Sequence, residues 1–581
     1  MYLPKKPEKP KENPFAVQKS RRFIAASAGV ALITTAIAAF FTLEKVRERQ
    51  RRPDGVLQQQ RGGPRVVIIG AGAAGSALAA SLTSSSADLQ VTVIERERKH
   101  VFQAMVPLAH VGHRSYDLNT TGGVDFLRSP ATWNVTRDAS LVWGDVVRVD
   151  TARNEVIVRE RPNATSAAAV GGGGGTESPP QSSWAMALRF WKPRGEGGGG
   201  GEAAAVERRY AYDALVVACG AERALGPLQQ FLEPAQVDRR CIAVNPGVTR
   251  DCLAHIFKGT VLHVKVPPAS FARDGAMRYT SRQHDGTFVG SVNTIWRYLS
   301  YFNKLELCPY IAVTADRQPS DAFPSVLNER IADHWRRRGV DFVTSSYLTN
   351  VDPRRKEATL YNYAMNEQRV VPYQLLVLDL PLAAPAFIRE SGLSGSLETD
   401  GFVDVHHQTL QHRTHANIFA LGDCAALPTV KSYGAAFAQV PVVSHNVQQQ
   451  LRRMPSSGKT VDADENPGFA RYDGYSSFHI VMTTWRAMWP ELLYGAATRE
   501  AHKSQSYTLD TAPLVMTNHH MWDNLAWSDL RGFLNAAYYQ LFLYEVMFYF
   551  MFTRAAWYPP TWFSVPTFSE ESGTRLRGGL M

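Results

Sequence analysis

The pattern of apolar and polar positions divides the chain into three kinds of segment. Residues 23–43, "FIAASAGVALITTAIAAFFTL", form one run of 21 uncharged residues. From residue 64 onward, short apolar runs alternate with turns and helical patterns, which predicts an α/β protein. From Phe533 to Phe552 the chain is apolar and aromatic again, with Glu545 as its only charge.

The run 23–43 is the best candidate for a transmembrane helix, because 21 helical residues cover a bilayer core of roughly 30 Å. A cleaved signal or an organelle-targeting segment is the competing interpretation. The preceding residues 1–22 are basic and rich in proline, which argues against an amphipathic transit helix. Lys and Arg flank the run on both sides, so the charge bias gives only a faint preference for orientation.

The globular part opens with a dinucleotide-binding pattern. In "RVVIIGAGAAGSALAASL", an apolar strand leads into Gly70, Gly72 and Gly75 and then into an Ala-rich helix. The first glycine permits the tight turn, the second lets a pyrophosphate approach the backbone, and the third allows close helix packing. The next strand, "LQVTVIE", ends at Glu95, where a carboxylate can accept the hydroxyls of a ribose.

Two later segments complete this pattern. "YDALVVACGAE" is a strand that ends in a turn at Gly220, and "NIFALGD" is a strand that ends in Gly422 and Asp423. The order resembles the FAD-binding domain of flavoproteins with two dinucleotide-binding domains. That resemblance implies that Asp423 holds the ribityl chain of FAD and that Cys424 lies close to the flavin ring. A surface Gly-Asp turn is the alternative.

A second nucleotide site is not indicated. The strand "KGTVLHVKVP" in the middle of the chain leads into "PASFARDGAMRYTSR", which has no GxGxxG. This loop therefore lacks the glycines that close approach to a second pyrophosphate requires. We expect neither an NADH dehydrogenase nor a glutathione-reductase-like enzyme.

Composition excludes other classes. The formal net charge is +10, but much of the excess lies around the apolar run near the N-terminus and no basic-aromatic module is present, so nucleic-acid binding is not expected. The five cysteines have neither metal-ligand spacing nor the arrangement of a disulfide framework. We therefore expect no metal site and a reducing compartment.

The C-terminal half carries a sharper resemblance. "DGFVDVHHQTLQHRTHANIFALGDCAALPTVKS" and the later "YDGYSSFHIVM" resemble the mitochondrial-type sulfide:quinone oxidoreductases. The resemblance implies FAD as cofactor, sulfide as electron donor, ubiquinone as acceptor and a place on the mitochondrial inner membrane. It also implies the following cofactor-side residues: Gly70, Gly72, Gly75, Glu95, Gln103, Val146, Gly220, Gly422, Asp423 and Lys431. Tyr475 and Phe478 are the quinone-side candidates.

The redox cysteines depart from the family's pattern. The resemblance implies that Cys424 is the catalytic member of a cysteine pair and that its partner follows the mid-chain strand. No cysteine occurs between Val264 and Ala276. A lone thiol cannot form the intramolecular disulfide that sulfide must open. Cys424 is then either a retained redox thiol or a small buried apolar residue. The segment "AMVPLAH" also lacks the family's usual Gln-Pro step.

Two further segments are unusual for a compact enzyme. The insertion 162–206 has glycine runs on both sides of "SSWAMALRFWKPR", which could dock on a partner or a membrane surface or remain disordered. The aromatic tail could span a membrane, but a carboxylate near its centre is costly in lipid. The resemblance instead implies C-terminal helices that enter one leaflet and guide quinone to the flavin.

The sequence therefore predicts an α/β fold with two Rossmann-like dinucleotide-binding domains, an N-terminal transmembrane helix and a C-terminal membrane-associated helical region. The predicted segments are the tail 1–22, the transmembrane helix 23–43, the linker 44–63, the FAD-binding domain 64–257 and 395–452, the second Rossmann-like domain 258–394 and the quinone or membrane region 453–581. Two roles remain open. One is a membrane-bound FAD enzyme that passes electrons from sulfide, or another small donor, to ubiquinone, and the other is an accessory subunit of a respiratory complex.

Overall fold

The computed structural model describes the two sheets of the protein and the segments around them. The described residues are 62–85, 88–97, 100–101, 106–112, 127–128, 139–160, 207–224, 228, 241–244, 246–268, 271, 287–395, 399–453, 468–483, 485–494, 514–516, 533 and 536–537. Several predicted features lie outside these ranges: the apolar run 23–43, Gln103, the insertion 162–206 and nearly all of the aromatic tail.

The first sheet has seven strands in the order β19-β8-β1-β2-β5-β6-β7. The first five strands in this order are parallel, and β6 and β7 continue the sheet antiparallel. The elements are β1 (Arg65–Ile69), α2 (Ala73–Ser85), β2 (Gln90–Glu95), β5 (Ala139–Asp150), β6 (Glu155–Glu160), β7 (Glu207–Ala211), β8 (Ala214–Val217) and β19 (Ile418–Ala420).

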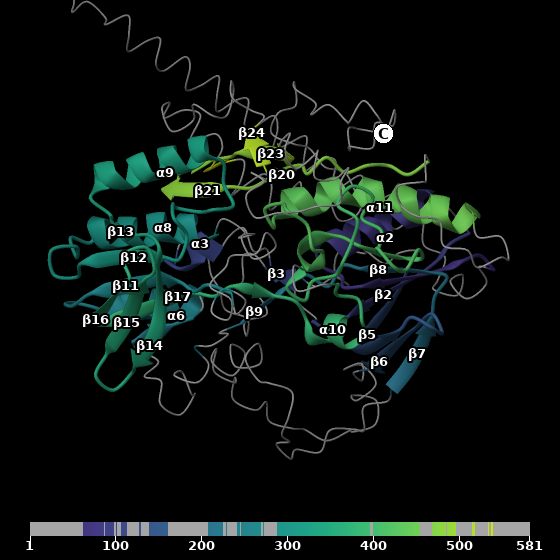
Figure 1. Ribbon diagram of the computed structural model, residues 1–581, viewed down its shortest axis with the longest axis horizontal. Helices are drawn as coiled ribbons and strands as arrows, with labels where there is room; N and C mark the ends of the chain where they lie inside the picture. Colours follow the sequence, from purple (N-terminus) through teal and green to yellow (C-terminus); the bar gives the residue numbers. More distant parts are fainter. Residues whose placement is uncertain are drawn as a thin grey trace, which may run out of the picture. The chain divides into compact units, whose positions relative to one another are not determined.

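The apolar runs of the sequence become the central strands of this sheet. All four residues of β8 are fully buried, and the last four of β1 are buried too, as expected for parallel strands covered on both faces. The long helix α11 (Tyr433–Arg453) packs along α2 (Figure 1), and the Ser81 hydroxyl donates to Ser444 Oγ at 2.9 Å. A segment from far along the chain thus completes the domain that begins at β1.

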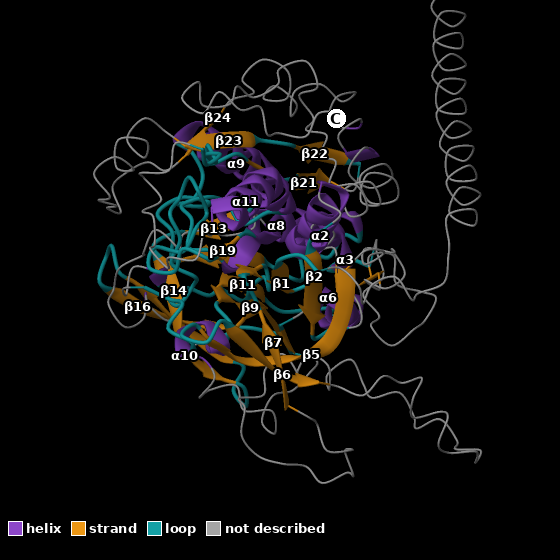
Figure 2. Cartoon of the chain, turned by 90° about the vertical axis from the view of Figure 1, so that its right-hand side faces the viewer, coloured by secondary structure: helices purple, strands orange, loops and turns teal. Residues whose placement is uncertain are grey.

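The second sheet has five parallel strands in the order β10-β17-β11-β12-β13. A separate antiparallel sheet, β14-β15-β16, follows in the chain (Figure 2). The elements are β10 (Ile242–Ala243), α6 (Pro246–His255), β11 (Val261–Lys265), α8 (Thr287–Tyr301), β12 (Tyr310–Thr314), α9 (Ser325–Arg338), β13 (Asp341–Val343), β14 (Ser346–Asp352), β15 (Glu357–Asn362), β16 (Glu367–Pro372) and β17 (Leu375–Asp379).

The edge strand of the second sheet begins earlier than the predicted domain boundary at residue 258. Ile242 and Ala243 pair in register with Leu376 and Val377 of β17. Both side chains are fully buried at this edge, so residues 242–255 belong to the second sheet rather than to the first. The α/β fold is as predicted, with five parallel strands in each of the two large sheets.

Short elements connect and extend the sheets. The pair β9-β18 joins Arg223 to Leu382, and β21 packs on α8. The remaining elements are β3 (His100–Val101), α3 (Val106–Ala109), β4 (Leu127–Arg128), β9 (Glu222–Arg223), β18 (Leu382–Ala383), α10 (Ala386–Glu390), the 3-10 turn η6 (Gly422–Cys424), β20 (Ser476–Ser477), β21 (Ile480–Thr483), β22 (Arg486–Met488), β23 (Glu491–Tyr494) and β24 (Leu514–Met516). Among the helices of the described ranges, none is both long and apolar enough to cross a bilayer.

Candidate dinucleotide site

The glycine turn after β1 has the geometry that close approach of a ligand requires. Gly70 has φ +104° and donates its N–H to the Ile94 carbonyl at 2.7 Å. A Cβ on Gly75 would lie 1.9 Å from the Gly70 carbonyl oxygen, so a side chain there cannot fit. A Cβ on Gly72 would meet nothing within 4 Å. The middle of the turn is therefore open, while both of its ends are closely packed.

Helix α2 begins directly after this opening. It starts at Ala73 and runs for 13 residues, so the positive end of its dipole lies at the turn. Backbone N–H groups at such a helix start can donate to phosphate oxygens. The turn and the helix together have the geometry that the predicted pyrophosphate site requires.

Glu95 lies at the end of β2 and reaches the same turn. Its carboxylate accepts from the Ala71 N–H at 2.6 Å and from the Glu97 N–H at 2.8 Å. Burial raises the pKa of Glu95, and the N–H bonds from Glu97 and Ala71 only partly oppose this shift. The carboxylate is thus held beside the glycine turn, where it can accept ribose hydroxyls.

An ion pair that the sequence analysis missed lies next to Glu95. The Arg96 guanidinium donates to Glu222 at 2.5 Å, which links the end of β2 to β9. Gly220, with φ +69° and open space around its Cβ position, turns the chain between β8 and this contact. Val146 is half-buried on β5 and pairs with Val158 of β6.

The turn after β19 brings Gly422 and Asp423 to this end of the sheet. Gly422 has φ +74°, and its N–H donates to Gln439 Oε1 of α11 at 2.7 Å. Its Cβ position is 3.3 Å from the Ala74 side chain at the start of α2. Asp423 is half-buried. The Gly-Asp turn is therefore fixed against the glycine turn and is not a surface turn.

Lys431 is a buried cation beneath this turn. Its ammonium donates to the Asp423 carbonyl at 2.6 Å and to the Ala425 carbonyl at 3.1 Å, and it lies 4.3 Å from the centre of the Phe402 ring. Burial lowers the pKa of Lys431 to about 8, although Asp423 and Cys424 favour the charged form. The lysine therefore fixes the backbone around Asp423 and places a positive charge next to it.

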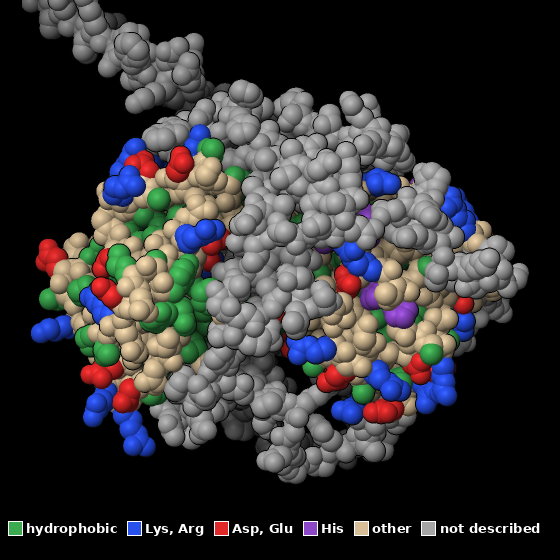
Figure 3. All heavy atoms as spheres, in the orientation of Figure 1, with side chains coloured by type: hydrophobic (Ala, Val, Ile, Leu, Met, Phe, Trp, Pro, Cys, Tyr) green, Lys and Arg blue, Asp and Glu red, His purple; other side chains and the backbone are tan. Residues whose placement is uncertain are grey.

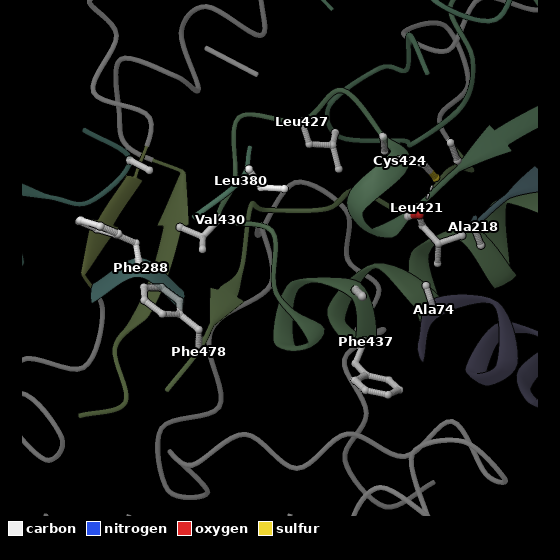
Figure 4. Close-up of a cluster of buried hydrophobic side chains, with 14 of the residues drawn as sticks. Ala74, Ala218, Phe288, Leu380, Leu421, Cys424, Leu427, Val430, Phe437 and Phe478 are labelled. Atoms are coloured by element: carbon white, nitrogen blue, oxygen red, sulfur yellow. Dashed lines mark hydrogen bonds between the residues drawn. The ribbon is translucent and has the colours of Figure 1, made fainter. Parts of the chain in front are cut away.

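Cys424 points into the protein. Its side chain is 0% exposed, and its sulfur lies 3.2 Å from the Val217 carbonyl and 3.3 Å from the Leu421 carbonyl. Figure 4 shows Cys424 beside Leu421 and Ala218. A small donor cannot reach this sulfur from solvent without local opening, so the burial favours the alternative in which Cys424 is a small core residue.

Cys219 is the contact of Cys424 that sequence reasoning missed. Cys219 follows β8, which pairs with β19, and its sulfur lies 3.7 Å from the Gly220 carbonyl. Interaction with Cys424 and burial raise the pKa of Cys219 well above its ordinary value. Burial also raises the pKa of Cys424, but interaction with Cys219 and the charge of Lys431 bring it below its ordinary value. The pairing of β8 with β19 brings the two residues to the same end of the sheet, and no local sequence pattern indicates it.

The predicted quinone-side residues lie in the core. Phe478 is 2% exposed and stacks on Phe323 with ring centres 5.1 Å apart. Tyr475 is 1% exposed, and its hydroxyl donates to the buried Glu491. Figure 4 shows Phe478 close to Phe288 of α8. Both residues thus pack the C-terminal strands, and neither lies on the described surface.

The carboxyl ends of the second sheet hold an ion pair. Lys265, the last residue of β11, pairs with Asp316 after β12, and their side chains are 3% and 2% exposed. β11 continues into Val266, Pro267 and Pro268 rather than into a glycine turn. This edge is where a second dinucleotide would bind in an open parallel sheet. The buried pair of Lys265 and Asp316 lies at this edge.

Comparison with known proteins supports the dinucleotide-binding fold of the first sheet. The family described as pyridine nucleotide-disulphide oxidoreductase matches residues 64–246. The mitochondrial sulfide:quinone oxidoreductase of Mus musculus is 30% identical over 166 residues, which are 28% of this chain and 34% of that protein. The chain thus spans about a third of the length of the curated relatives that it matches.

Two solved structures share the fold over most of the chain. A chain of the Tetrahymena thermophila mitochondrial ATP synthase has a TM-score of 0.58 at 16% identity, and the match covers 88% of this chain and 100% of that one. The sulfide:quinone oxidoreductase of the bacterium Aquifex aeolicus has a TM-score of 0.55 at 13% identity, with 85% and 92% covered. The glycine turn, the "GDC" strand and these matches agree in a similarity to the sulfide:quinone oxidoreductases.

Proposed function

We propose that the chain binds one FAD in its first sheet. The observation that carries this proposal is the open space at Gly72 between two closely packed glycines. The pyrophosphate would lie at this opening, Glu95 would accept the ribose hydroxyls, and Asp423 would hold the ribityl chain. Lys431 would place its positive charge near the flavin. When bound, FAD supplies two-electron transfer chemistry.

The family's reaction is the first of two candidate roles. In it the protein passes two electrons from sulfide, or another small donor, through FAD to ubiquinone at the mitochondrial inner membrane. The names of the curated relatives support the mitochondrial location and this chemistry. The burial of Cys424 and the absence of a cysteine between Val264 and Ala276 argue against efficient sulfide oxidation.

An accessory subunit of a mitochondrial respiratory complex is the second role, and the geometry favours it. The buried thiol and the core positions of Tyr475 and Phe478 leave no described surface at which donor or quinone would react. The match to a whole chain of the Tetrahymena ATP synthase is an example of this fold within a large mitochondrial assembly. In this role FAD would stabilise the fold.

Nucleic acid is not proposed as a partner. On the face drawn in Figure 3, cationic and anionic side chains lie interspersed over the described surface, without a continuous basic area. A polyanion would need such an area to neutralise several phosphates at once. The proposed partners are the membrane, ubiquinone and, in the second role, protein subunits.

The test of FAD binding is direct. Protein purified from its native membrane and denatured by heat should release close to one FAD per chain, measured by fluorescence and chromatography. Well-folded protein without flavin would refute the proposal.

A second experiment separates the two roles. Mixing the purified protein with sulfide should leave its flavin oxidised over seconds, whereas dithionite should bleach it. In native gels the protein should migrate with a complex far larger than its 64.4 kDa chain. Rapid bleaching by sulfide together with migration as a small species would favour the enzyme instead.

A further inference from the structure

Arginine and aromatic side chains gather where α8, α9 and the β21-β22 hairpin meet. Asn293 of α8 fixes this junction, because its amide donates to the Val481 carbonyl of β21 at 2.8 Å and accepts from Trp335 of α9 at 2.8 Å. Figure 1 shows the two helices and β21 on the same side of the second sheet. The surface of this junction is therefore carried by elements that are bound to one another.

Arg338, the last residue of α9, lies at the centre of this surface. Its guanidinium lies 5.2 Å from the centre of the Trp296 ring of α8 and donates to the Met482 carbonyl of β21 at 3.4 Å. Arg297 follows Trp296 on α8, and Arg486 begins β22, the strand that pairs with β21. Arg297 and Arg486 are exposed. Three elements thus bring one arginine each to the same part of the surface.

The protein itself offsets these charges less than it offsets others on α9. The two arginines before Arg338 pair with Asp333 of the same helix at 3.5 and 2.6 Å. Among the residues that the structure describes, no carboxylate forms an ion pair with Arg297 or Arg338. Burial lowers the pKa of Arg338, and repulsion by Arg297 and Arg486 adds to this shift. An anion that binds from outside would relieve the repulsion.

Exposed aromatic rings adjoin the outer two arginines. Trp485 lies in the turn before β22, and its ring centre is 6.1 Å from that of Phe533. Tyr301 lies one helical turn after Arg297 on α8, and its ring meets that of Phe302 edge-on at 5.1 Å. All four rings are exposed. Aromatic rings beside basic side chains are typical of a surface at the boundary between membrane and water.

We propose that the surface formed by Arg297, Arg338, Arg486 and the rings beside them binds the phosphates of anionic phospholipids in a membrane. A guanidinium group can donate two parallel hydrogen bonds to one phosphate. Three such groups neutralise only a few phosphates, which fits separate lipid headgroups rather than the continuous row in a nucleic acid. The inference rests on the membrane partner proposed above, and it adds the lipid class and the face that meets it.

The start of the aromatic tail favours a membrane over an acidic protein surface. Phe533 is the first residue of the run 533–552, and its contact with Trp485 places the start of that run beside Arg486. The run is apolar and aromatic with Glu545 as its only charge, so its composition suits lipid. If it enters one leaflet, the arginines lie near the headgroups of the same leaflet. Their attraction to these headgroups should weaken in salt, which screens exposed charges.

The test titrates the detergent-solubilised full-length protein with two short-chain lipids, the anionic dioctanoyl phosphatidylglycerol and the zwitterionic dioctanoyl phosphatidylcholine. Thermophoresis should show about tenfold tighter binding of the anionic lipid at low salt, and high salt should remove the preference. Equal affinities at low salt would overturn the proposal. So would displacement of the lipid by an equal concentration of inorganic phosphate, which would indicate a site for free phosphate. Tighter binding of poly-glutamate than of the anionic lipid would indicate an acidic protein partner instead.

A pair of double variants locates the site. Arg297→Gln with Arg486→Gln removes two exposed charges, leaves Arg338 in place and should reduce the preference to about twofold. Arg354→Gln with Arg369→Gln is the matched control, because it removes two exposed charges from the separate β14-β15-β16 sheet and should keep the preference. An equal loss in both variants would assign the effect to net charge and overturn the site.

Failure of the lipid site can be told apart from failure of the membrane partner. Membranes that contain the natural protein are washed with alkaline carbonate alongside the lipid titration. Protein that stays in the pellet but binds the two lipids equally would refute the lipid site alone. Protein that is released into the supernatant would refute the membrane partner and the lipid site with it.

Discussion

At the scale of single residues, the site depends on where a Cβ fits. The glycine fingerprint predicts three different roles for three glycines, and the structure separates them. Gly70 needs its positive φ, a Cβ on Gly75 would collide with the Gly70 carbonyl, and a Cβ on Gly72 would meet open space. Of these three positions, only Gly72 can accept a methyl group without disturbing the protein itself.

This difference gives a matched pair of variants. Gly72→Ala should keep the melting temperature of the flavin-free protein within a degree or two, but it should lower the FAD content at least tenfold, because the methyl group occupies the pyrophosphate position. Gly75→Ala should destabilise the protein by several kcal/mol, because its Cβ would lie 1.9 Å from the Gly70 oxygen. Flavin content by absorbance and melting by circular dichroism distinguish the two. Full flavin content in Gly72→Ala would show that the turn does not hold the cofactor.

Lys431 should make stability depend on alkaline pH. Burial lowers its pKa to about 8, against 10.5 for an ordinary lysine. Below pH 8 both the folded and the unfolded states carry the charge. Between the two pKa values the unfolded state binds more protons than the folded state, so stability rises with pH in that window. The difference in pKa corresponds to about 3 kcal/mol.

The measurement compares the natural protein with Lys431→Met in denaturant at pH 7 and pH 10. Loss of the bonds to the Asp423 and Ala425 carbonyls lowers the variant's stability by a similar amount at both values. The natural protein should therefore gain stability relative to the variant as the pH rises. If the difference in unfolding free energy between the natural protein and Lys431→Met is the same at both pH values, Lys431 keeps an ordinary pKa.

At the scale of elements, local sequence patterns were sufficient to predict the strands of the first sheet that carry the candidate site. The strands that end at Ile69 and Glu95, and the strand before Gly422, lie where the sequence places them. Each prediction depended on a turn or an acid next to an apolar run. The contact of Cys219 with Cys424 could not be read in this way, because it depends on the pairing of strands that are about 200 residues apart. The edge strand β10 is only two residues long and has no local signal of its own.

The buried pair at the second sheet leads to a prediction about this element. Lys265→Met would leave the carboxylate of Asp316 buried without its cation, and we expect a loss of about 3–5 kcal/mol. Adding Asp316→Leu should recover much of this loss, because no buried charge then remains. The exposed pair of Arg65 and Asp213 is the control, since Arg65→Ala should cost about 1 kcal/mol or less. If the double variant is as unstable as Lys265→Met, an unpaired buried charge does not explain the loss. The ion pair would then stabilise the fold by more than the neutralisation of its two charges.

At the scale of the whole molecule, the folded part and the membrane attachment are separate questions. The described residues, which begin at Gly62, contain both sheets and the candidate site. The apolar run 23–43 precedes them and is joined to the first strand by the linker 44–63. If the run is a membrane anchor, its attachment rests on burial of apolar surface in lipid and does not depend on the charges that salt screens.

The last prediction follows from that distinction. The full-length protein should stay in the membrane pellet after high salt and after alkaline carbonate, because neither treatment weakens burial of about 30 Å of apolar helix. Removing residues 1–43 should leave weaker binding through the aromatic tail 533–552, and mild detergent should release the shortened protein. The FAD content should not change on this deletion, since the glycine turn begins after residue 69. Free solubility of the shortened protein would show that the tail is buried within the fold, whereas unchanged carbonate resistance would show that the run 23–43 is not the anchor.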